Sequence, residues 1–450
     1  DKSIAVLPFV DMSEKHDQEY FSDGLSEELI DRLSHNPDLK VIARTSSFAF
    51  KGRNEDIRTI ARTLGVANLL EGSVRKSGNQ LRITAQLIRA ADGVDLWSES
   101  FERQLNDVFK VQQDIAAAVV TGLQAKLLPA AIAPNSTPHN MDAYSLYLRG
   151  QYFARRFSDA DVAQGIAILK QAIALEPDFA PAHAELANAC LYVATFGTAE
   201  AGMLENAMRE NDAALRLDPT LRSALNLRAS LAVINWDWPA AKAQLDQLLA
   251  SGPHDAGALA QSAGLTRAFG HLDQALTYYR ESLQLDPLSV LRHIQLAMLL
   301  DGMGRPADAR AALDAAIAIN PKAAKAHLLI ALLELAAGRL DAASAEIEKE
   351  SGDWYRLEGR VILAFARKRL PESNAALARL IDCCHAAAAV QIAQAYAYRG
   401  ERDQAFEWLD RAYTQKDPGL INVKTDSLFT SLRGDPRFSN LLRRMKLPES

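Results

Sequence analysis

Basic side chains form the most conspicuous group that could do chemistry, close to Ser46 and Ser47. Several positive charges near two hydroxyl groups are typical of a site that holds a phosphate or another anion. The residues of this candidate anion site are Arg44, Lys51, Arg53, Arg58 and Arg62.

Catalytic motifs are missing from the sequence. Lys51-Gly52-Arg53 and Leu64-Gly65-Val66 lack the spacing of a phosphate-binding loop, and no G-x-G-x-x-G, H-E-x-x-H or G-x-S-x-G motif occurs. Asp23 and Glu27-Glu28 fit a solvated helix N-terminus, where acids favour the helix dipole, better than paired catalytic carboxylates. We therefore expect no enzyme activity, no catalytic residue, no cofactor and no metal in this chain.

The three cysteines are too few for a disulfide framework. Cys383 and Cys384 are adjacent, and adjacent cysteines rarely pair with each other. The spacing from Cys190 to this pair fits no zinc site. We expect ordinary buried thiols on helices.

Length and charge limit the class of protein. A chain of 450 residues with 48% hydrophobic and 24% charged residues is expected to form two or more soluble globular domains. A net charge of −6 argues against direct nucleic-acid binding. Because the sequence begins at Asp1 without methionine, directly before a strand-like run, we expect it to be part of a longer protein.

Helical repeats account for the last two-thirds of the chain. Pro219, Pro253, Pro287 and Pro321 are 34 residues apart, which is the tetratricopeptide period. Aligning on them brings small residues into register where paired helices cross: Ala187, Ala229, Ala263, Ala297 and Ala331 on first helices, and Ala241, Ala275, Ala309 and Ala343 on second helices. Gly270, Gly304 and Gly338 fall at the turn between helices, where we expect a left-handed conformation. Residues 142–420 thus resemble the tetratricopeptide repeat family.

That resemblance implies a concave groove lined by the first helix of each repeat. Asparagine there can bind a peptide backbone, and arginine or lysine can bind a carboxylate. The alternative is a solvated surface without a ligand. The groove candidates are Tyr147, Asn188, Asn226, Ser230, Arg267, Met298, Asp301, Lys325 and Leu328.

Histidine and tryptophan residues in the repeats are interpreted as packing residues. His183, His293 and His327 share the fourth repeat position, which indicates packing at the core edge and not ligands. Trp236 and Trp238 flank a turn that lacks the usual glycine. We expect them to pack locally, with partner anchoring as the alternative.

The first 130 residues predict a small α/β domain. Apolar and alternating runs predict strands at 3–9, 41–43, 69–75, 81–89 and 94–101. Helical spacing predicts helices at 26–33, 54–64 with Asn54 as cap, and 107–128. This order indicates an α/β sandwich with a mixed sheet.

Several separated motifs in this region resemble the TolB-amino-terminal-like domain. They are Ile4–Pro8, Tyr20–Leu29, Ala43–Phe48, Leu64–Val66, Glu71–Arg75 and Leu96–Glu99. In that family the domain precedes tetratricopeptide repeats in bacterial signalling proteins. The resemblance implies an upstream effector, such as the winged helix of CadC-like transcriptional regulators or a class III adenylate cyclase, often with a transmembrane helix between.

The sequence therefore predicts an α+β protein with a regulatory function. We expect it to bind a protein or peptide partner and to relay binding to an upstream effector, with a soluble assembly adaptor as the alternative. A homodimer and an upstream membrane anchor are further possibilities. We expect a periplasmic location if that anchor exists, and otherwise a cytoplasmic one. The expected parts are 1–128 as the α/β domain, 129–141 as a linker, 142–419 as about eight repeats, and 420–450 as C-terminal capping helices.

Overall fold

The computed structural model describes residues 2–449 except 35, 37, 79, 105–117, 119–139, 157, 197–201 and 253–254. The helix predicted at 107–128 thus falls almost wholly outside the described residues. The chain divides into two compact units. Unit 1 comprises Asp1–Leu231, Ala243–Ala258 and Gln284–Pro287, and unit 2 comprises Ala232–Lys242, Leu259–Leu283 and Leu288–Ser450.

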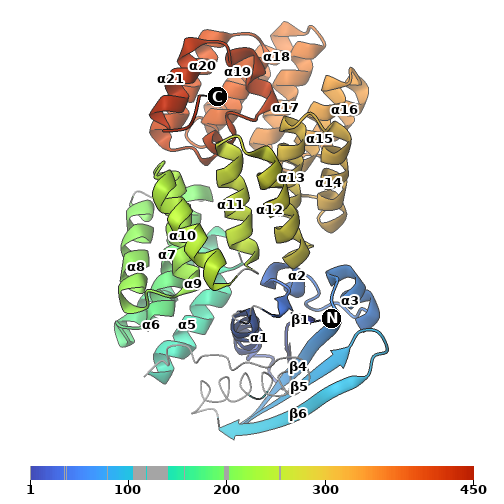
Figure 1. Ribbon diagram of the computed structural model, residues 1–450, viewed down its shortest axis with the longest axis vertical. Coiled ribbons are helices and arrows are strands. Elements are labelled where there is room, and N and C mark those ends of the chain that lie inside the picture. Colours follow the sequence, from blue (N-terminus) through green and yellow to red (C-terminus); the bar gives the residue numbers. More distant parts are fainter. Residues whose placement is uncertain are drawn as a thin grey trace. The chain divides into compact units, whose positions relative to one another are not determined.

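A mixed β-sheet begins unit 1 (Figure 1). Its strands are β1 (Ser3–Val6), β2 (Val10–Asp11), β3 (Lys40–Val41), β4 (Asn68–Ser77), β5 (Gln80–Arg89) and β6 (Asp95–Gln104). The order is β3-β1-β4-β5-β6, with β1 parallel to β3 and β4, and with β4, β5 and β6 antiparallel. Alternate β5 residues Ile83, Ala85 and Leu87 are buried, as their spacing predicts. The mixed sheet followed by many helices confirms the α+β fold class.

Three helices of the described residues accompany this sheet: α1 (Glu19–Ser34), α2 (Arg44–Phe48) and α3 (Ile57–Leu64). The predicted start of α1 at Ser26 is wrong, because the helix continues back through Gly24 to Glu19. At Gly24 the absence of a side chain leaves room for Leu148, since an added Cβ would lie 2.7 Å from the Leu148 side chain. The cap of α3 is Asp56 and not Asn54, since the Asp56 side chain accepts from the amide of Thr59.

The sheet and the first repeat helices share one hydrophobic core within unit 1. Ile4, Leu25 and Leu29 belong to the same buried cluster as Tyr144 and Leu148. Helix α1 packs against α5 (Met141–Ala154). The short approach at Gly24 fixes how closely these two helices lie.

Sixteen described helices build the repeats as antiparallel pairs, in agreement with the predicted period. In the first pair, α5 packs with α6 (Asp159–Leu175). The other pairs are α7 (Ala180–Phe196) with α8 (Met203–Leu217); α9 (Arg222–Ile234) with α10 (Trp238–Ser251); α11 (Ala256–Ala268) with α12 (Leu272–Leu285); α13 (Val290–Gly302) with α14 (Pro306–Ile319); α15 (Ala326–Ala336) with α16 (Leu340–Lys349); α17 (Asp353–Ala366) with α18 (Leu370–Cys384); and α19 (Ala389–Tyr398) with α20 (Arg402–Gln415).

The three glycines predicted to be left-handed at interhelical turns are left-handed. Gly270, Gly304 and Gly338 have φ angles of 90°, 71° and 74°. Where glycine is missing, Trp236 and Lys368 take the same conformation, with φ of 56° and 61°. The register alanines predicted at the helix crossings are all buried.

Two 3-10 turns and a short helix end unit 2. They are η2 (Pro418–Asn422), η3 (Ser427–Leu432) and α21 (Pro436–Arg444). Their apolar side chains Leu420, Phe429 and Leu432 are completely buried. The tail therefore packs on the repeats of unit 2 through buried apolar side chains.

The prediction for the cysteines is partly wrong. Cys190 is buried as expected, but Cys383 and Cys384 are joined by a disulfide. They are the last two residues of α18.

Candidate recognition pocket beside helix α1

A pocket of about 390 Å³ lies within unit 1. Residues of α1, α5, α7 and α9 line it, together with the segments at 218–221 and 255–257. A cavity of this size, bounded by both modules of unit 1, can hold one or two side chains of a partner or a small organic molecule.

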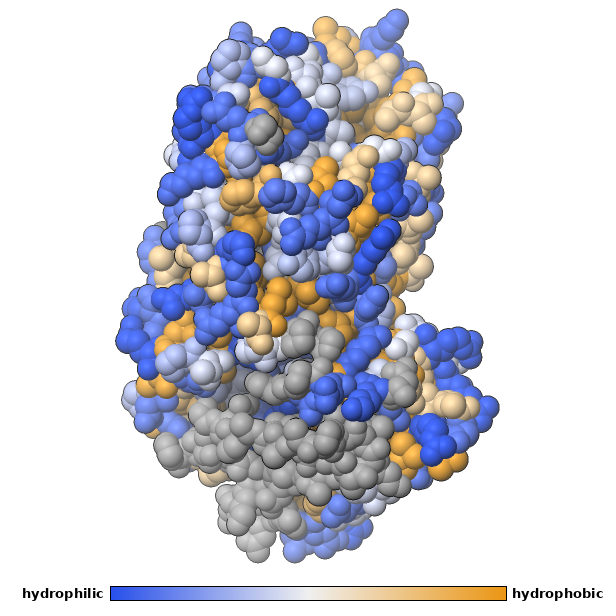
Figure 2. All heavy atoms as spheres, in the orientation of Figure 1, coloured by the Kyte–Doolittle hydropathy of each residue, from blue (hydrophilic) through white to orange (hydrophobic). Residues whose placement is uncertain are grey.

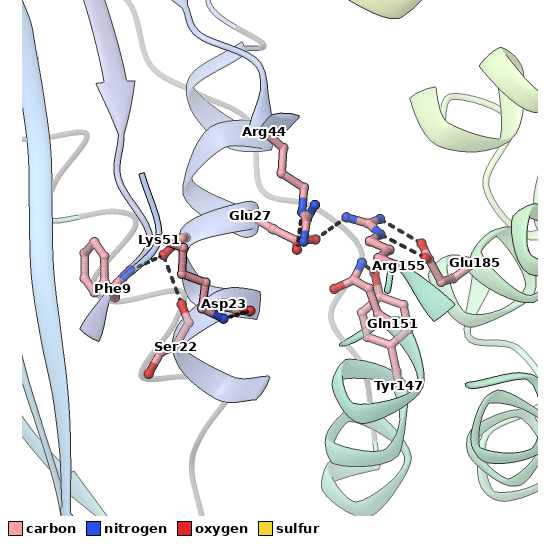
Figure 3. Close-up of polar contacts among 11 residues, drawn as sticks. Phe9, Ser22, Asp23, Glu27, Arg44, Lys51, Tyr147, Gln151, Arg155 and Glu185 are labelled. Carbon is pink, nitrogen blue, oxygen red and sulfur yellow. Dashed lines mark hydrogen bonds and ion pairs between the residues drawn. The ribbon is translucent and has the colours of Figure 1, made fainter. Parts of the chain in front are cut away.

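Arg155, the residue directly after α5, connects the two modules at the wall of this pocket (Figure 3). Its guanidinium donates two parallel hydrogen bonds to Glu185 on α7, Nε to Oε1 at 2.9 Å and Nη2 to Oε2 at 2.8 Å. Its remaining nitrogen, Nη1, donates to Glu27 on α1. Glu27 also accepts from Nε of Arg44 at 2.5 Å. A continuous charged chain thus runs from the α/β domain to the second repeat pair.

The charge of Arg155 is stabilised by its surroundings. Burial alone would lower the pKa of Arg155, but the nearby carboxylates of Glu185 and Glu27 outweigh burial and raise it. The side chain of Glu27 is only 11% exposed. The prediction that Glu27 lies on a solvated helix terminus is therefore wrong.

Tyr147 supplies a neutral hydroxyl beside this chain of charges. Burial raises the pKa of Tyr147, so that the phenol keeps its proton. Gln151 donates from Nε2 to this hydroxyl at 3.0 Å. The Tyr147 ring packs edge-on against Phe179 at a centroid distance of 5.2 Å. The hydroxyl is thus held in place and keeps one proton to donate.

Asp255 organises another part of the lining. Its Oδ2 accepts from Nη2 of Arg222 at 2.8 Å and from Nδ2 of Asn226 at 3.2 Å. Its Oδ1 accepts from the amide of Ala258 at 2.8 Å, near the start of α11.

Acidic groups outnumber basic groups in the lining. The carboxylates belong to Glu27, Glu28, Asp31, Glu185, Asp218 and Asp255, and the guanidinium groups to Arg44, Arg155 and Arg222. The excess negative charge favours a positively charged group in the pocket.

The structure does not gather the five residues of the candidate anion site. Arg44 lines the pocket, whereas Lys51 forms ion pairs with Asp23 at 2.6 Å and Glu19 at 2.7 Å. Arg53 pairs with Glu55, Arg58 donates to the carbonyl of Asp92, and Arg62 lies in the last turn of α3. The partners of the first four are carboxylates or a carbonyl, which do not prepare a site for a further anion.

The groove candidates are placed in three different surroundings. Tyr147 and Asn226 line the pocket, while Asn188 and Ser230 donate to carbonyl groups of their own helices. In unit 2, Leu328 is 2% exposed and belongs to the core, and Met298 packs against the core. Arg267, Asp301 and Lys325 remain, and the C-terminal segment of the chain reaches two of them: Ser427 donates to Asp301, and Asp417 and Asp426 interact electrostatically with Lys325.

Sequence reasoning did not single out Arg155 or Glu185 and misjudged Glu27. Arg155 caps the first helix of one repeat and Glu185 lies on the first helix of the next, so the repeat register could have suggested their contact. Glu27 belongs to a different module, 128 residues from Arg155, and no periodic signal connects them.

Exposed hydrophobic side chains are dispersed. On the face drawn in Figure 2, hydrophobic residues lie in small groups among hydrophilic ones. Among the described residues, the large hydrophobic side chains with most exposure are Val10, Met12, Val94, Leu175, Met208, Leu217, Leu291 and Leu370. They lie on several elements, so they do not indicate one broad apolar docking surface.

Two family models match parts of the chain. Residues 1–118 match the second domain of HilA/YgeH-like transcriptional regulators, and residues 294–351 match a tetratricopeptide repeat. Regulator-like and repeat domains of this kind are generally non-catalytic.

A curated protein from Rhizobium meliloti (strain 1021), named putative adenylate cyclase 3, is 40% identical over 186 residues. The match covers 41% of this chain and 32% of that protein. The chain thus spans only about a third of the length of this relative.

Solved structures share the helical-repeat fold. A monomeric mutant of IFIT1 with Gppp-AAAA has a TM-score of 0.50 at 15% identity, covering 76% of this chain and 77% of that one. A structure of Pseudomonas aeruginosa PilF has a TM-score of 0.38 at 19% identity, covering 45% and 90%. At these identities the likeness concerns the fold alone.

The part of the chain that the structure describes holds no candidate membrane span and no candidate metal site. No helix there is long and apolar enough to cross a bilayer. Within the same residues, no group of three or more histidine, cysteine, aspartate or glutamate side chains could hold a metal ion.

Proposed function

We propose that this chain is the non-catalytic regulatory region of a bacterial signalling protein, and that a protein partner inserts a basic side chain into the pocket beside α1. The regulator-like match over residues 1–118, the repeat match and the relative named as a cyclase all support a regulatory setting. The TolB-amino-terminal-like motifs support the same setting.

One observation carries the proposal: Arg155 joins Glu27 of the α/β domain to Glu185 of the repeats at the pocket wall. A cationic side chain that enters the pocket competes with Arg155 for these two carboxylates. Binding therefore weakens a contact that holds α1 against the repeats. The pocket and the joint between the two modules are coupled through the same three side chains.

The charge and the size of the pocket favour a basic peptide segment over other ligands. Six lining carboxylates face three guanidinium groups, and Tyr147 can donate to a backbone carbonyl. About 390 Å³ accommodates one long side chain and its neighbouring backbone.

In this proposal the signal passes from α1 to an effector outside this chain, a winged-helix or cyclase domain. A membrane anchor upstream would place this region in the periplasm, and pairing of two copies would bring two effectors together. The competing proposal is an assembly adaptor, in which a partner binds but α1 does not respond.

A peptide array tests both proposals. Wild-type protein and the Glu27→Gln variant are applied to an array of random heptapeptides, and α1 is followed by hydrogen–deuterium exchange with a retained peptide. We expect lysine- or arginine-containing peptides to bind at least about tenfold more weakly to the variant, since one carboxylate is lost. Exchange in α1 is expected to increase when such a peptide binds to the wild type.

Glu102→Gln serves as the matched control, because Glu102 forms an exposed ion pair with Arg82 outside the pocket. Equal binding of basic peptides by wild type and Glu27→Gln would contradict the pocket assignment. Binding without any change in the exchange of α1 would support the adaptor.

A further inference from the structure

The C-terminal segment of unit 2 has a period of its own. Asp417, Asp426 and Asp435 are nine residues apart, and each precedes a short helical turn. The fourth and seventh positions of each nine-residue module are buried apolar residues: Leu420 and Val423, Phe429 and Leu432, and Phe438 and Leu441. The pattern is an aspartate followed by two apolar side chains at fixed distances.

Each aspartate first caps its own turn. Oδ1 of Asp417 accepts from the amide of Gly419 at 2.8 Å, and Oδ1 of Asp426 accepts from the amide of Leu428 at 2.9 Å. Oδ1 of Asp435 accepts from the amide of Arg437 at 2.9 Å. These capping bonds fix the short turns that present the apolar side chains.

The second carboxylate oxygen distinguishes the first two modules from the third. Oδ2 of Asp417 accepts from the amide of Val390, and Oδ2 of Asp426 accepts from Nε2 of Gln394 at 2.5 Å. Val390 and Gln394 are one turn apart on α19. In the third module, Oδ2 of Asp435 pairs instead with Arg437 of the same module. Helix α19 therefore holds two successive aspartates in similar ways.

First helices of other repeats in unit 2 contact the same segment. Ser427 donates from Oγ to Oδ2 of Asp301 on α13 at 2.8 Å. On the same helix, a Cβ added to Gly302 would lie 2.6 Å from the carbonyl oxygen of Thr425. On α11, a Cβ added to Gly264 would lie 4.0 Å from Ile421. The segment 417–432 thus lies on the first helices, which are the helices expected to line a partner groove.

Some buried polar atoms of unit 2 have no hydrogen-bond partner among the described residues. Arg267 on α11 is 3% exposed, and its Nε and Nη1 have no hydrogen-bond partner among the described residues. Oδ1 of Asn422 is also buried without a partner. Burial raises the pKa of Asp417 and of Asp426, which means that burying their charges opposes docking. A segment with better-matched polar groups would bind the same face more tightly.

We propose that the first helices of unit 2 form a peptide-binding groove that selects an aspartate followed by apolar side chains at the fourth and seventh positions. Residues 417–432 are its built-in occupant. A partner that presents the same pattern binds by displacing this segment. This groove is separate from the pocket of unit 1, and the proposal does not depend on the function assigned to that pocket.

The experiment uses the full chain and a fluorescein-labelled synthetic peptide of residues 417–432. The double variant Asp417→Ala and Asp426→Ala loses the contacts to Val390 and Gln394 and is expected to release its own segment. We expect hydrogen–deuterium exchange of residues 418–432 to increase at least about tenfold in the variant. By fluorescence anisotropy, the peptide is expected to bind the variant at least about tenfold more tightly than the wild type.

The matched chain control is Asp435→Ala, which removes the same kind of cap without a bond to α19. It is expected to leave exchange in 418–432 and peptide binding as in the wild type. The matched peptide control carries alanine at both aspartate positions and is expected not to bind. The variant Asp417→Asn with Asp426→Asn keeps one oxygen for each cap but points an NH2 group at the donors of Val390 and Gln394, and is expected to loosen the segment although its turns stay capped.

Equal peptide affinity for wild type and double alanine variant would overturn the proposal, as would unchanged exchange in 418–432. Binding of the alanine peptide as tightly as the native one would overturn the selectivity. If circular dichroism shows that the double variant does not fold, the single variant Asp426→Ala replaces it, with the same expected direction and the same contrary outcome.

Discussion

At the scale of single residues, His183 and His327 show how the repeat register assigns similar roles to distant positions. Nδ1 of His183 lies 2.7 Å from Oε2 of Glu210, and its Nε2 lies 3.0 Å from the carbonyl oxygen of Pro177. Nδ1 of His327 lies 2.7 Å from Oε2 of Glu346, and its Nε2 lies 3.1 Å from the carbonyl oxygen of Pro321. Each imidazole thus connects the carbonyl of a proline that precedes its own helix to a glutamate on the second helix of the same repeat. This agrees with packing at the core edge.

The pair of His183 and Glu210 predicts a dependence of stability on pH. Burial lowers the pKa of His183, but the hydrogen bonds to Glu210 and Pro177 outweigh it and raise the pKa above 6.5. The hydrogen bond to His183 lowers the pKa of Glu210 below 4.5. The pair therefore makes its full contribution to stability between pH 4.5 and pH 6.5, the ordinary pKa values of the two groups. Its contribution is lost as pH rises through the raised pKa of His183, and also as pH falls through the lowered pKa of Glu210.

We expect the free energy of unfolding of unit 1 to contain a contribution of roughly 1 kcal/mol from this pair at about pH 5.5, and little of it at about pH 8. His183→Gln should remove that difference, as measured by urea unfolding at both pH values. His385→Gln, at an exposed position in unit 2, is the control and should keep the wild-type dependence. A variant at His183 with the full wild-type dependence would show that other groups cause it.

At the scale of elements, the crossing of α5 and α6 depends on the absence of side chains. A Cβ added to Gly165 on α6 would lie 2.7 Å from the backbone nitrogen of Ala154 and 2.9 Å from the carbonyl oxygen of Gly150. Both atoms belong to the backbone of α5, which cannot move aside as a flexible side chain can. Close packing at this crossing therefore requires glycine.

Gly165→Ala is expected to lower the free energy of unfolding by about 1–3 kcal/mol, because the clash exceeds the gain of about 1 kcal/mol in helix propensity. Thermal unfolding followed by circular dichroism measures the change. Gly434→Ala is the control, since a Cβ at Gly434 would meet no atom within 4 Å. An unchanged or higher melting temperature for Gly165→Ala would mean that the two helices can separate without cost.

The elements of the repeats could be predicted from the sequence because each repeat restates the same physical requirements. Small residues at helix crossings and left-handed residues at turns recur at fixed spacing. The repeat pattern can therefore be recognised even though single units depart from it. Trp236 and Lys368 adopt the same turn conformation without glycine. The start of α1 could not be predicted, since Gly24 is a poor helix former and its close approach to Leu148 cannot be read from the sequence.

At the scale of the whole molecule, unit 2 is closed by contacts between its first and last segments. Nε1 of Trp238 donates to the carbonyl oxygen of Met445 at 2.6 Å, and both residues are buried. The ring of Trp236 stacks on that of Tyr413 at 6.4 Å. The expectation that the two tryptophans pack locally is therefore incomplete, since their partners lie more than 170 residues away.

Trp238→Phe keeps an aromatic ring but leaves the carbonyl of Met445 without its donor. We expect the free energy of unfolding of unit 2 to fall by about 1–3 kcal/mol, the usual cost of a buried unsatisfied group. Tryptophan fluorescence in urea can follow it, because Trp236, Trp354 and Trp408 remain in unit 2. Trp408→Phe, a partly exposed position, should change stability by less than about 0.5 kcal/mol. Equal effects of the two substitutions would contradict the role given to this contact.

Contacts between distant segments set the limit of sequence-based prediction here. The α+β class and the repeat pairs follow from local periodicity. The pocket does not, because Glu27 and Arg155 meet only after the sheet and the repeats have packed on each other. The contacts of the C-terminal segment with α19 do not either, since they join residues that no local period relates.

The core shared by the sheet and the first repeat pair has a consequence for cutting the gene. A fragment that ends with β6 would keep every described strand but would lose Tyr144 and Leu148, leaving Leu25 and Gly24 exposed to water. Such a fragment would aggregate or stay partly unfolded. Expression boundaries, and the exchange of this module between proteins, should therefore follow α6 or a later helix and not the last strand of the sheet.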